Sequence, residues 1–177
     1  MKLFFGLGNP GKQYQNTRHN LGQMIIDNFI KAQHAAPLRL KSKLKSNLTE
    51  IDKNIFATSS DFMNLSGVSV QKVAAFYKIS PENIYLIHDD LDLPVGEWRL
   101  QFDRGPAGHN GVKSVIENLG TQAFWRLRVG IGKPQSSVAS GEGDPEEYVL
   151  KPFSKEEKVI ISETIDKIIT EIENLGH

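Results

Sequence analysis

Three histidines of the sequence lie beside turn or loop signals and near acidic or amide residues: His19, His88 and His109. Histidine titrates close to neutral pH, so a histidine held against a carboxylate can act as a general base. His19 precedes a predicted helix, and Asp89 lies at the carboxyl end of a predicted strand. We predict that Asp89 fixes the tautomer of His19 and that His19 activates water, although a lone histidine is more often structural.

Asparagines form a second group of candidates: Asn9 in a glycine-rich turn, Asn64, and Asn110 at the start of a predicted helix. Local capping of turns and helices would explain each of them separately. If they converge, their neutral amides can donate and accept hydrogen bonds, which suits binding a peptide backbone and polarising an ester carbonyl. The helix start at His109-Asn110 also offers backbone N–H groups for a phosphate or a developing oxyanion.

Two other kinds of site fit the residues less well. Residues 88–92 supply nitrogen and oxygen ligands for a metal, but neighbouring residues on an extended strand point to opposite sides. Residues 6–11 match the glycine pattern of a dinucleotide-binding loop. In that motif the third glycine already lies in a helix, whereas Pro10 and the polar residues 12–18 delay the helix here. Asp27 falls inside this helix rather than at the end of a second strand.

Hydrophobic periodicity and turn signals predict the elements that position these side chains. Strands are expected over 2–7, 84–88, 97–102 and 125–131, with a loop over 89–94, a hairpin over 47–51 and 54–58, and an alternating segment over 38–45. Helices are expected over 20–33, 65–77, 110–119 and 154–175, the last amphipathic and docked on the domain. We predict one domain over 1–177, an α/β three-layer sandwich with a twisted mixed β-sheet flanked by helices, and a mobile loop near 133–145.

Composition narrows the class of protein. The 177 residues hold 21 basic and 21 acidic side chains and no cysteine, which excludes disulfides, thiolate metal sites and a cysteine nucleophile. No apolar run approaches the roughly 18 residues of a membrane span, so we expect a cytoplasmic protein. The net charge of zero is unevenly distributed along the chain. Residues 1–60 include nine basic and three acidic residues, and residues 136–177 include four basic and ten acidic residues. A polyanionic partner is therefore compatible with the sequence.

Six segments, in this order along nearly the whole chain, form a specific pattern: residues 6–11 with Tyr14, 17–20, 62–67, 88–94, 108–113 and 126–132. Together they resemble the bacterial-type peptidyl-tRNA hydrolases. The resemblance implies a monomeric enzyme without cofactor, metal or obligate protein partner. Such an enzyme cleaves the ester between the carbonyl of a peptide and the 3′ ribose of tRNA, and it contacts the acceptor stem and 3′ end of its substrate. Free tRNA is thereby recycled for translation.

The resemblance also implies roles for individual residues. His19 would be the general base, and Asp89 would orient and stabilise it. Asn9 would distinguish an N-acylated substrate from an aminoacyl-tRNA with a free ammonium group, and Asn64 and Asn110 would hold the peptide and the attacked carbonyl. Tyr14 and Phe62 would line the site. The candidates for contact with tRNA phosphates are Arg99, Arg104, Lys113 and Arg128.

The chain departs from the family pattern in two places. Pro106-Ala107 replaces part of a glycine-rich stretch and removes its first histidine, which predicts a stiffer loop before Asn110. Gln101 stands where relatives often have a lysine thought to touch tRNA phosphates. Two rival functions stay open at this point. A tRNA-binding protein without catalysis would bind in a salt-sensitive manner but not turn over, and a metal-dependent hydrolase would be inactivated by a chelator.

Overall fold

The computed structural model describes residues 1–134 and 143–177, and its centre is a seven-stranded mixed sheet. The strands are β1 (Leu3–Gly6), β2 (Arg39–Lys41), β3 (Ser46–Ile51), β4 (Asn54–Ser59), β5 (Ile84–Asp90), β6 (Trp98–Phe102) and β7 (Trp125–Gly130). The helices are α1 (Leu21–Ala32), α2 (Ser66–Tyr77), α3 (Asn110–Leu119), α4 (Pro145–Val149) and α5 (Lys155–Gly176). Single 3₁₀ turns span Arg18–Asn20, Ser42–Leu44, Met63–Leu65 and Pro81–Asn83.

Four parallel strands form the middle of the sheet. In the order β2-β3-β4-β1-β5-β7-β6, strands β4, β1, β5 and β7 run parallel, whereas β2, β3 and β6 are paired antiparallel to their neighbours. The carboxyl ends of the four parallel strands therefore meet at one edge of the sheet, which is where ligands bind in open α/β folds.

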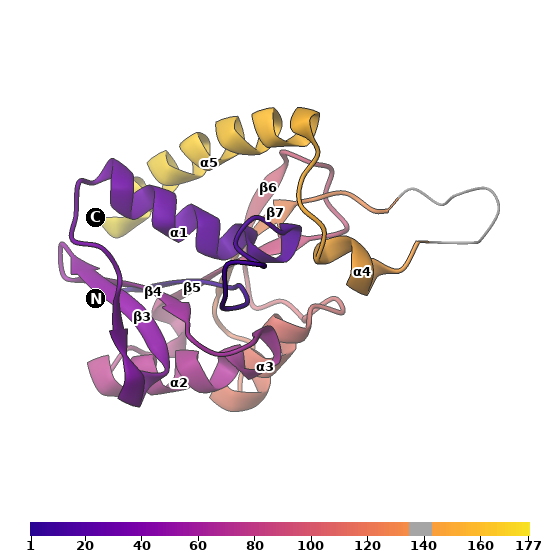
Figure 1. The fold of residues 1–177 in the computed structure, drawn as a ribbon. Helices are drawn as coiled ribbons and strands as arrows, with labels where there is room; N and C mark the ends of the chain where they lie inside the picture. The colour runs from indigo at the N-terminus through magenta and orange to yellow at the C-terminus, as the bar shows by residue number, and fades with distance from the viewer. Residues whose placement is uncertain (135–142) are drawn as a thin grey trace.

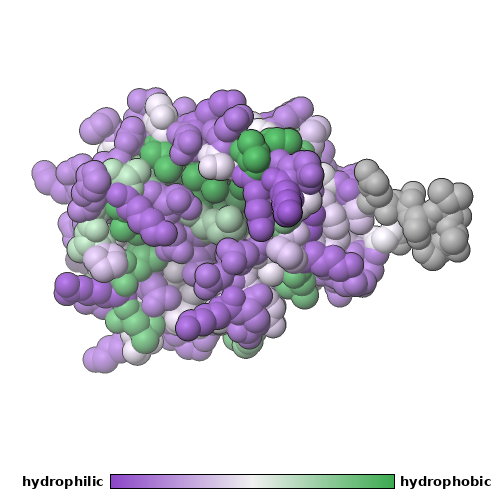
Figure 2. All heavy atoms as spheres, turned by 45° about the horizontal axis from the view of Figure 1, so that its top comes forward, coloured by the Kyte–Doolittle hydropathy of each residue, from purple (hydrophilic) through white to green (hydrophobic). Residues whose placement is uncertain are grey.

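Helices cover both faces of the sheet, so the predicted α/β three-layer sandwich is confirmed (Figure 1). Helices α1 and α5 lie on one face, and α2 and α3 lie on the other. The apolar stripe of α5 packs into the core beside α1, as its amphipathic pattern predicts; it comprises Ile161, Ile165, Ile168 and Ile172. Figure 2 shows that hydrophilic side chains predominate on the outer surface of this layer.

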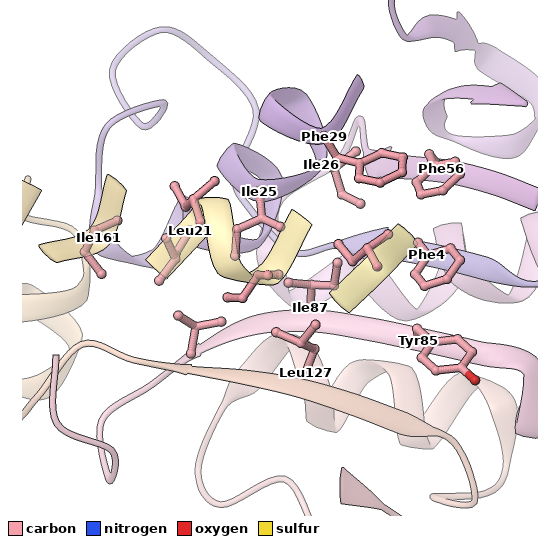
Figure 3. Packing of buried hydrophobic residues seen from close by; sticks show 14 of the residues in the cluster. Phe4, Leu21, Ile25, Ile26, Phe29, Phe56, Tyr85, Ile87, Leu127 and Ile161 are labelled. Atoms are coloured by element: carbon pink, nitrogen blue, oxygen red, sulfur yellow. The ribbon is translucent and has the colours of Figure 1, made fainter. Parts of the chain in front are cut away.

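Aromatic stacking joins α1 to three neighbouring strands (Figure 3). The ring of Phe56 stacks on Phe29 of α1 at 4.5 Å and on Phe4 at 5.0 Å, and Phe4 stacks on Tyr85 at 4.9 Å. Each such pair stabilises the fold beyond its buried area by about 0.5–1.5 kcal/mol. At the other end of α1, Gly22 lets the helix touch the sheet, since a Cβ there would lie 2.1 Å from the carbonyl oxygen of Ile87. The start of α1 is thus held against β5.

The structure corrects several expected boundaries. Strand β5 extends to Asp90, so Asp89 and Asp90 lie in the strand rather than in a loop over 89–94. The alternating segment over 38–45 forms only three residues of β2, followed by a 3₁₀ turn. Helix α4 was not expected, because its five residues are too few to show a period. The predicted mobile loop near 133–145 falls largely outside the described residues. None of the helices in the described ranges is long and apolar enough to cross a bilayer.

Candidate active site

A cavity of about 880 Å³ opens at the carboxyl ends of the parallel strands. The predicted catalytic and substrate-binding residues reach it from five segments: the turn after β1, the 3₁₀ turn before α1, the segment after β4, the end of β5 and the start of α3. Those that line it are Asn9, His19, Phe62, Asn64, Asp89 and Asn110, and two of the candidates for tRNA contact, Arg104 and Arg128, line it as well. The three asparagines therefore converge with His19 and Asp89 in one cavity.

Asp89 lies between two histidines at the base of the site. Its carboxylate accepts hydrogen bonds from Nδ1 of His19 at 3.0 Å and from Nε2 of His109 at 3.0 Å. The Asp89 side chain is buried, and the two imidazole rings are tilted against each other with centroids 4.8 Å apart. With Nδ1 of His19 donating to Asp89, the other ring nitrogen, Nε2, is free to accept a proton from water.

The ring orientation of His109 is fixed because its side chain caps helix α3. Its Nδ1 accepts hydrogen bonds from the backbone N–H groups of Gly111 and Val112, at 3.1 and 3.4 Å. That nitrogen therefore carries no hydrogen, and Nε2 must carry the ring hydrogen and donate it to Asp89. If Nδ1 carried a hydrogen, that N–H group would face the backbone N–H groups of Gly111 and Val112. His109 thus stabilises the Asp89 carboxylate by donating its Nε2–H.

The protonation states of the site follow from this arrangement. Burial opposes a charge on His19, but the charge and hydrogen bond of Asp89 outweigh it and raise the pKa of His19. Burial would raise the pKa of Asp89, yet the two histidines hold that pKa far below its usual range. Burial is the main cause that lowers the pKa of His88 to about 3, so this third histidine of the cavity stays neutral. Asp89 is therefore ionised, and the pKa of His19 lies above its ordinary value.

Asn9 is oriented by its neighbours so that it presents a donor to the cavity. Its Oδ1 accepts from the backbone N–H of Met63 at 2.8 Å, and the carboxamide of Asn20 bonds to both the backbone N–H and the carbonyl of Asn9. The Asn9 Nδ2 group has no hydrogen-bond partner among the described residues. Asn20 is a supporting residue that the sequence reasoning missed, although it directly follows His19 in one of the six quoted segments.

Asn64 and Asn110 line the cavity as exposed residues, within reach of a bound substrate. The expectation that the start of α3 offers free backbone N–H groups is wrong for two of them. Those of Gly111 and Val112 are already bonded to His109. The side-chain amides of Asn64 and Asn110 offer further donors for a developing oxyanion at this point.

The two aromatic candidates lie at different depths. Phe62 lines the cavity and is 52% exposed. Tyr14 does not line it but packs edge to face against Phe62, with ring centroids 6.2 Å apart. Tyr14 therefore supports the rim of the cavity rather than its wall.

The four candidates for tRNA contact are also placed differently. Arg104 lines the cavity. Arg99 and Lys113 are 58% and 65% exposed outside it, where they can meet an extended partner. Arg128 is buried, its Nε lies 2.7 Å from the Asp90 carboxylate, and it also bonds to Gln101. Its charge is already neutralised within the protein, so the geometry does not favour Arg128 as a phosphate contact.

The same geometry speaks against a metal at the histidines. Three possible ligand atoms lie within 4.8 Å of one another, one each from His19, Asp89 and His109, which is close enough to hold an ion. A metal at His109 would need the lone pair of Nε2, but the α3 amides force the ring hydrogen onto that nitrogen. This donor set fits hydrogen bonds to a carboxylate better than it fits a cation.

Arg18 was not predicted as a site residue, yet it anchors the segment that carries His19. Its guanidinium donates to the carbonyls of Lys151 and Pro152, pairs with Glu157 at 2.6 Å, and lies 4.2 Å from the ring centroid of Tyr148. The backbone N–H of Arg18 also bonds to the Lys151 carbonyl. The last helices of the chain thus fix the position of the residue directly before His19.

Replacing Arg18 by methionine is expected to lower kcat by about 10- to 100-fold with little change in KM, because His19 loses its alignment while the binding groups stay in place. The apparent pKa of the pH-rate profile should shift as well, since His19 moves relative to Asp89. Steady-state kinetics across pH measure both effects. Lys151→Ala is the matched control, because it leaves the backbone acceptor intact. Equal kinetics for Arg18→Met and wild type would show that this anchor does not position His19.

Comparisons with known proteins place the chain in one family. A family model described as peptidyl-tRNA hydrolase matches residues 3–177. A peptidyl-tRNA hydrolase of Aquifex aeolicus is 43% identical over 176 residues, which cover 96% of this chain and 86% of that protein. One of Desulfitobacterium hafniense is also 43% identical, covering 94% and 88%. The crystal structure of peptidyl-tRNA hydrolase from Acinetobacter baumannii is 30% identical with a TM-score of 0.86, covering 98% of this chain and 87% of that one.

Proposed function

Because this chain belongs to the peptidyl-tRNA hydrolase family, we propose that it hydrolyses the ester between a peptide and the 3′ ribose of tRNA, with His19 as the general base. The observation that carries the proposal is the bridged arrangement of His19, Asp89 and His109 inside a cavity that three asparagines also line. This set of groups activates water and binds neutral amides.

The proposed reaction has two steps. Nε2 of His19 takes a proton from water while the water oxygen attacks the ester carbonyl, and Asp89 stabilises the imidazolium that forms. The carboxamides of Asn64 and Asn110 hold the peptide and donate to the developing oxyanion. His19 then returns the proton to the 3′ oxygen of the ribose as the carbon–oxygen bond breaks. The products are a peptide with a free carboxyl group and a free tRNA.

Asn9 provides the proposed basis for choosing an N-acylated substrate. Its Oδ1 is used by Met63, so only its Nδ2–H donors face the substrate. A donor pairs with the carbonyl of an acyl amide, whereas an ammonium group would be desolvated there without an acceptor or a counter-charge. The proposal includes peptidyl-tRNA as the partner through its acceptor end, a monomer without a cofactor, and a cytoplasmic enzyme.

The experiment compares N-acetyl-aminoacyl-tRNA with plain aminoacyl-tRNA. Wild type should cleave the acetylated substrate much faster, and should keep full activity in excess EDTA. In Asn9→Asp the carboxylate keeps an acceptor for the Met63 N–H but replaces the Nδ2 donor with an oxygen. We expect the ratio of kcat/KM for the two substrates to fall by about tenfold or more, because the new carboxylate pairs with the ammonium. Absence of turnover at saturating enzyme would overturn the proposed function, and an unchanged ratio would remove Asn9 from it.

A further inference from the structure

His88 lines the cavity beside His19 and His109, but it bonds to the backbone of Asp89 rather than to its carboxylate. The residue lies in β5 and is only 4% exposed. Its Nδ1 lies 2.8 Å from the backbone carbonyl oxygen of Asp89. A carbonyl oxygen can only accept a hydrogen bond, so Nδ1 carries the ring hydrogen and donates it. His88 therefore holds the main chain of the residue whose side chain holds His19.

The carbonyl of Asp89 lies beyond the end of the neighbouring strand β1. The next carbonyl along β5, that of Asp90, accepts from the backbone N–H of Ile131 on the β7 side. Successive carbonyls of a strand point to opposite neighbours, so the carbonyl of Asp89 points toward β1. The last backbone bond on that side runs from the N–H of Leu7 to the carbonyl of Ile87, two residues earlier. Within the described ranges, the imidazole is therefore the donor that replaces a strand partner.

The same imidazole also packs on the second histidine that binds Asp89. The rings of His88 and His109 meet edge to face, with centroids 4.9 Å apart. His109 is fixed by the amides of α3 and donates its Nε2–H to the Asp89 carboxylate. One buried side chain thus contacts both the backbone of Asp89 and a group that binds its carboxylate.

The neutral state of His88 suits these contacts. Burial is the main cause that holds its pKa at about 3, so the ring keeps a single hydrogen at neutral pH, and that hydrogen lies on Nδ1. Its Nε2 is buried and has no hydrogen-bond partner in the part of the chain that the structure describes. A charged ring here would compete for Asp89, whereas the neutral ring leaves the carboxylate to His19 and His109.

We propose that His88 is a positioning residue for Asp89: its Nδ1–H fixes the peptide unit after Asp89 and so keeps the carboxylate directed at His19. A strand-end carbonyl without a donor would turn toward another partner, because buried backbone groups are rarely left unpaired. Such a rotation would displace the adjoining side chain, and the alignment of a general base tolerates little displacement. The effect of His88 on turnover rests on the proposed function, whereas its effect on the pair of His19 and Asp89 does not.

Three substitutions separate a hydrogen-bonding role of His88 from a packing role. In His88→Asn the amide nitrogen can occupy the position of Nδ1 and keep the bond to the Asp89 carbonyl, whereas in His88→Gln it lies near the position of Nε2. Glutamine fills more of the buried volume but loses the donor, so packing and positioning predict opposite orders of activity. His88→Phe keeps a ring against His109 and removes both nitrogens.

Steady-state kinetics across pH provide the first readout. His88→Gln and His88→Phe should lower kcat for N-acetyl-aminoacyl-tRNA by about 10- to 100-fold with little change in KM, since the three asparagines of the cavity are untouched. His88→Asn should restore most of this loss. The rise of kcat with pH should move to lower pH in the first two variants, because a displaced carboxylate raises the pKa of His19 less. His34→Gln makes the same change at an exposed histidine and is the matched control.

An NMR titration of the His19 ring without substrate provides a second readout that needs no turnover. The pKa of His19 should be lower in His88→Gln and His88→Phe than in wild type, and in His88→Asn it should stay close to wild type. If these shifts appear but wild type hydrolyses no substrate, the proposed function fails and the role of His88 stands. If wild type turns over and the shifts are absent, only the role of His88 fails.

Other results would also overturn the positioning role. Equal losses in His88→Asn and His88→Gln would show that the whole ring matters rather than its Nδ1 donor. A lower Tm with unchanged kcat and unchanged pKa of His19 would make His88 structural, as would failure of both His88→Gln and His88→Phe to fold. If only one of these two variants folds, it carries the comparison with His88→Asn.

Discussion

Replacing His19 by asparagine is expected to lower kcat for N-acetyl-aminoacyl-tRNA by about 10²- to 10⁴-fold, the usual contribution of a general base. Asparagine can still donate a hydrogen bond to Asp89, so the variant tests the lost Nε2 rather than a lost contact. His34→Asn is the matched control, because His34 is exposed and lies beyond the end of α1. Equal turnover by wild type and His19→Asn would remove His19 as the base.

The pH dependence of wild type provides a second check on the same residue. A neutral His19 is required as the base, so kcat should rise with pH through the apparent pKa of this group. Since Asp89 raises the pKa of His19 in the folded protein, the apparent pKa of this rise in kcat should lie above the ordinary histidine value of about 6.5. A flat profile there would contradict the mechanism. The same rise in pKa implies a contribution to folding stability that is full at low pH and is lost as pH rises through the folded-state pKa.

Replacing Asp89 by asparagine should reduce kcat as strongly as replacing His19, again by about 10²- to 10⁴-fold. His109 cannot change its tautomer, because the α3 amides occupy its Nδ1, so its Nε2–H must bond to the single carboxamide oxygen. The carboxamide NH₂ then faces His19 and forces Nδ1 of His19 to accept. The hydrogen of His19 moves to Nε2, which can no longer take a proton from water.

Kinetics of the single and double variants test this coupling. Because the two residues act as one unit, the double variant should lose no more activity than either single variant. The residual activity of Asp89→Asn should also titrate at lower pH, since burial of His19 is no longer offset by a carboxylate. Asp52→Asn makes the same chemical change in an exposed turn and serves as the control. Additive losses in the double variant would contradict the tautomer argument.

The sequence predicts most of this fold because its signals are local. Buried runs such as Ile84 to Ile87 predict strands, and the alternating spacing from Ile161 to Ile172 predicts the face of α5 that packs on α1. Helix α4 has too few residues to show a period, and β5 extends through Asp89 and Asp90 only because β7 offers partners for their backbone. Local propensity does not register such tertiary pairing.

The residues of the candidate site can also be predicted from local signals, whereas their interactions cannot. The motif segments identify His19, Asp89 and the asparagines, since those residue types lie in turns and at element ends. The tautomer of His109, the orientation of Asn9 and the neutralisation of Arg128 each depend on a partner distant in sequence or on a backbone amide at a helix start.

The anchor of Arg18 bears on when the enzyme becomes active during its own synthesis. The chain leaves the ribosome from its N-terminus, so His19, Asp89 and His109 emerge well before Lys151, Pro152 and Glu157, which hold Arg18. The nascent chain therefore contains all of its proposed catalytic groups before it contains the contacts that align them. Full activity should appear only after residues 151–157 have left the ribosome and folded against Arg18, a useful order for an enzyme whose substrates are peptides attached to tRNA.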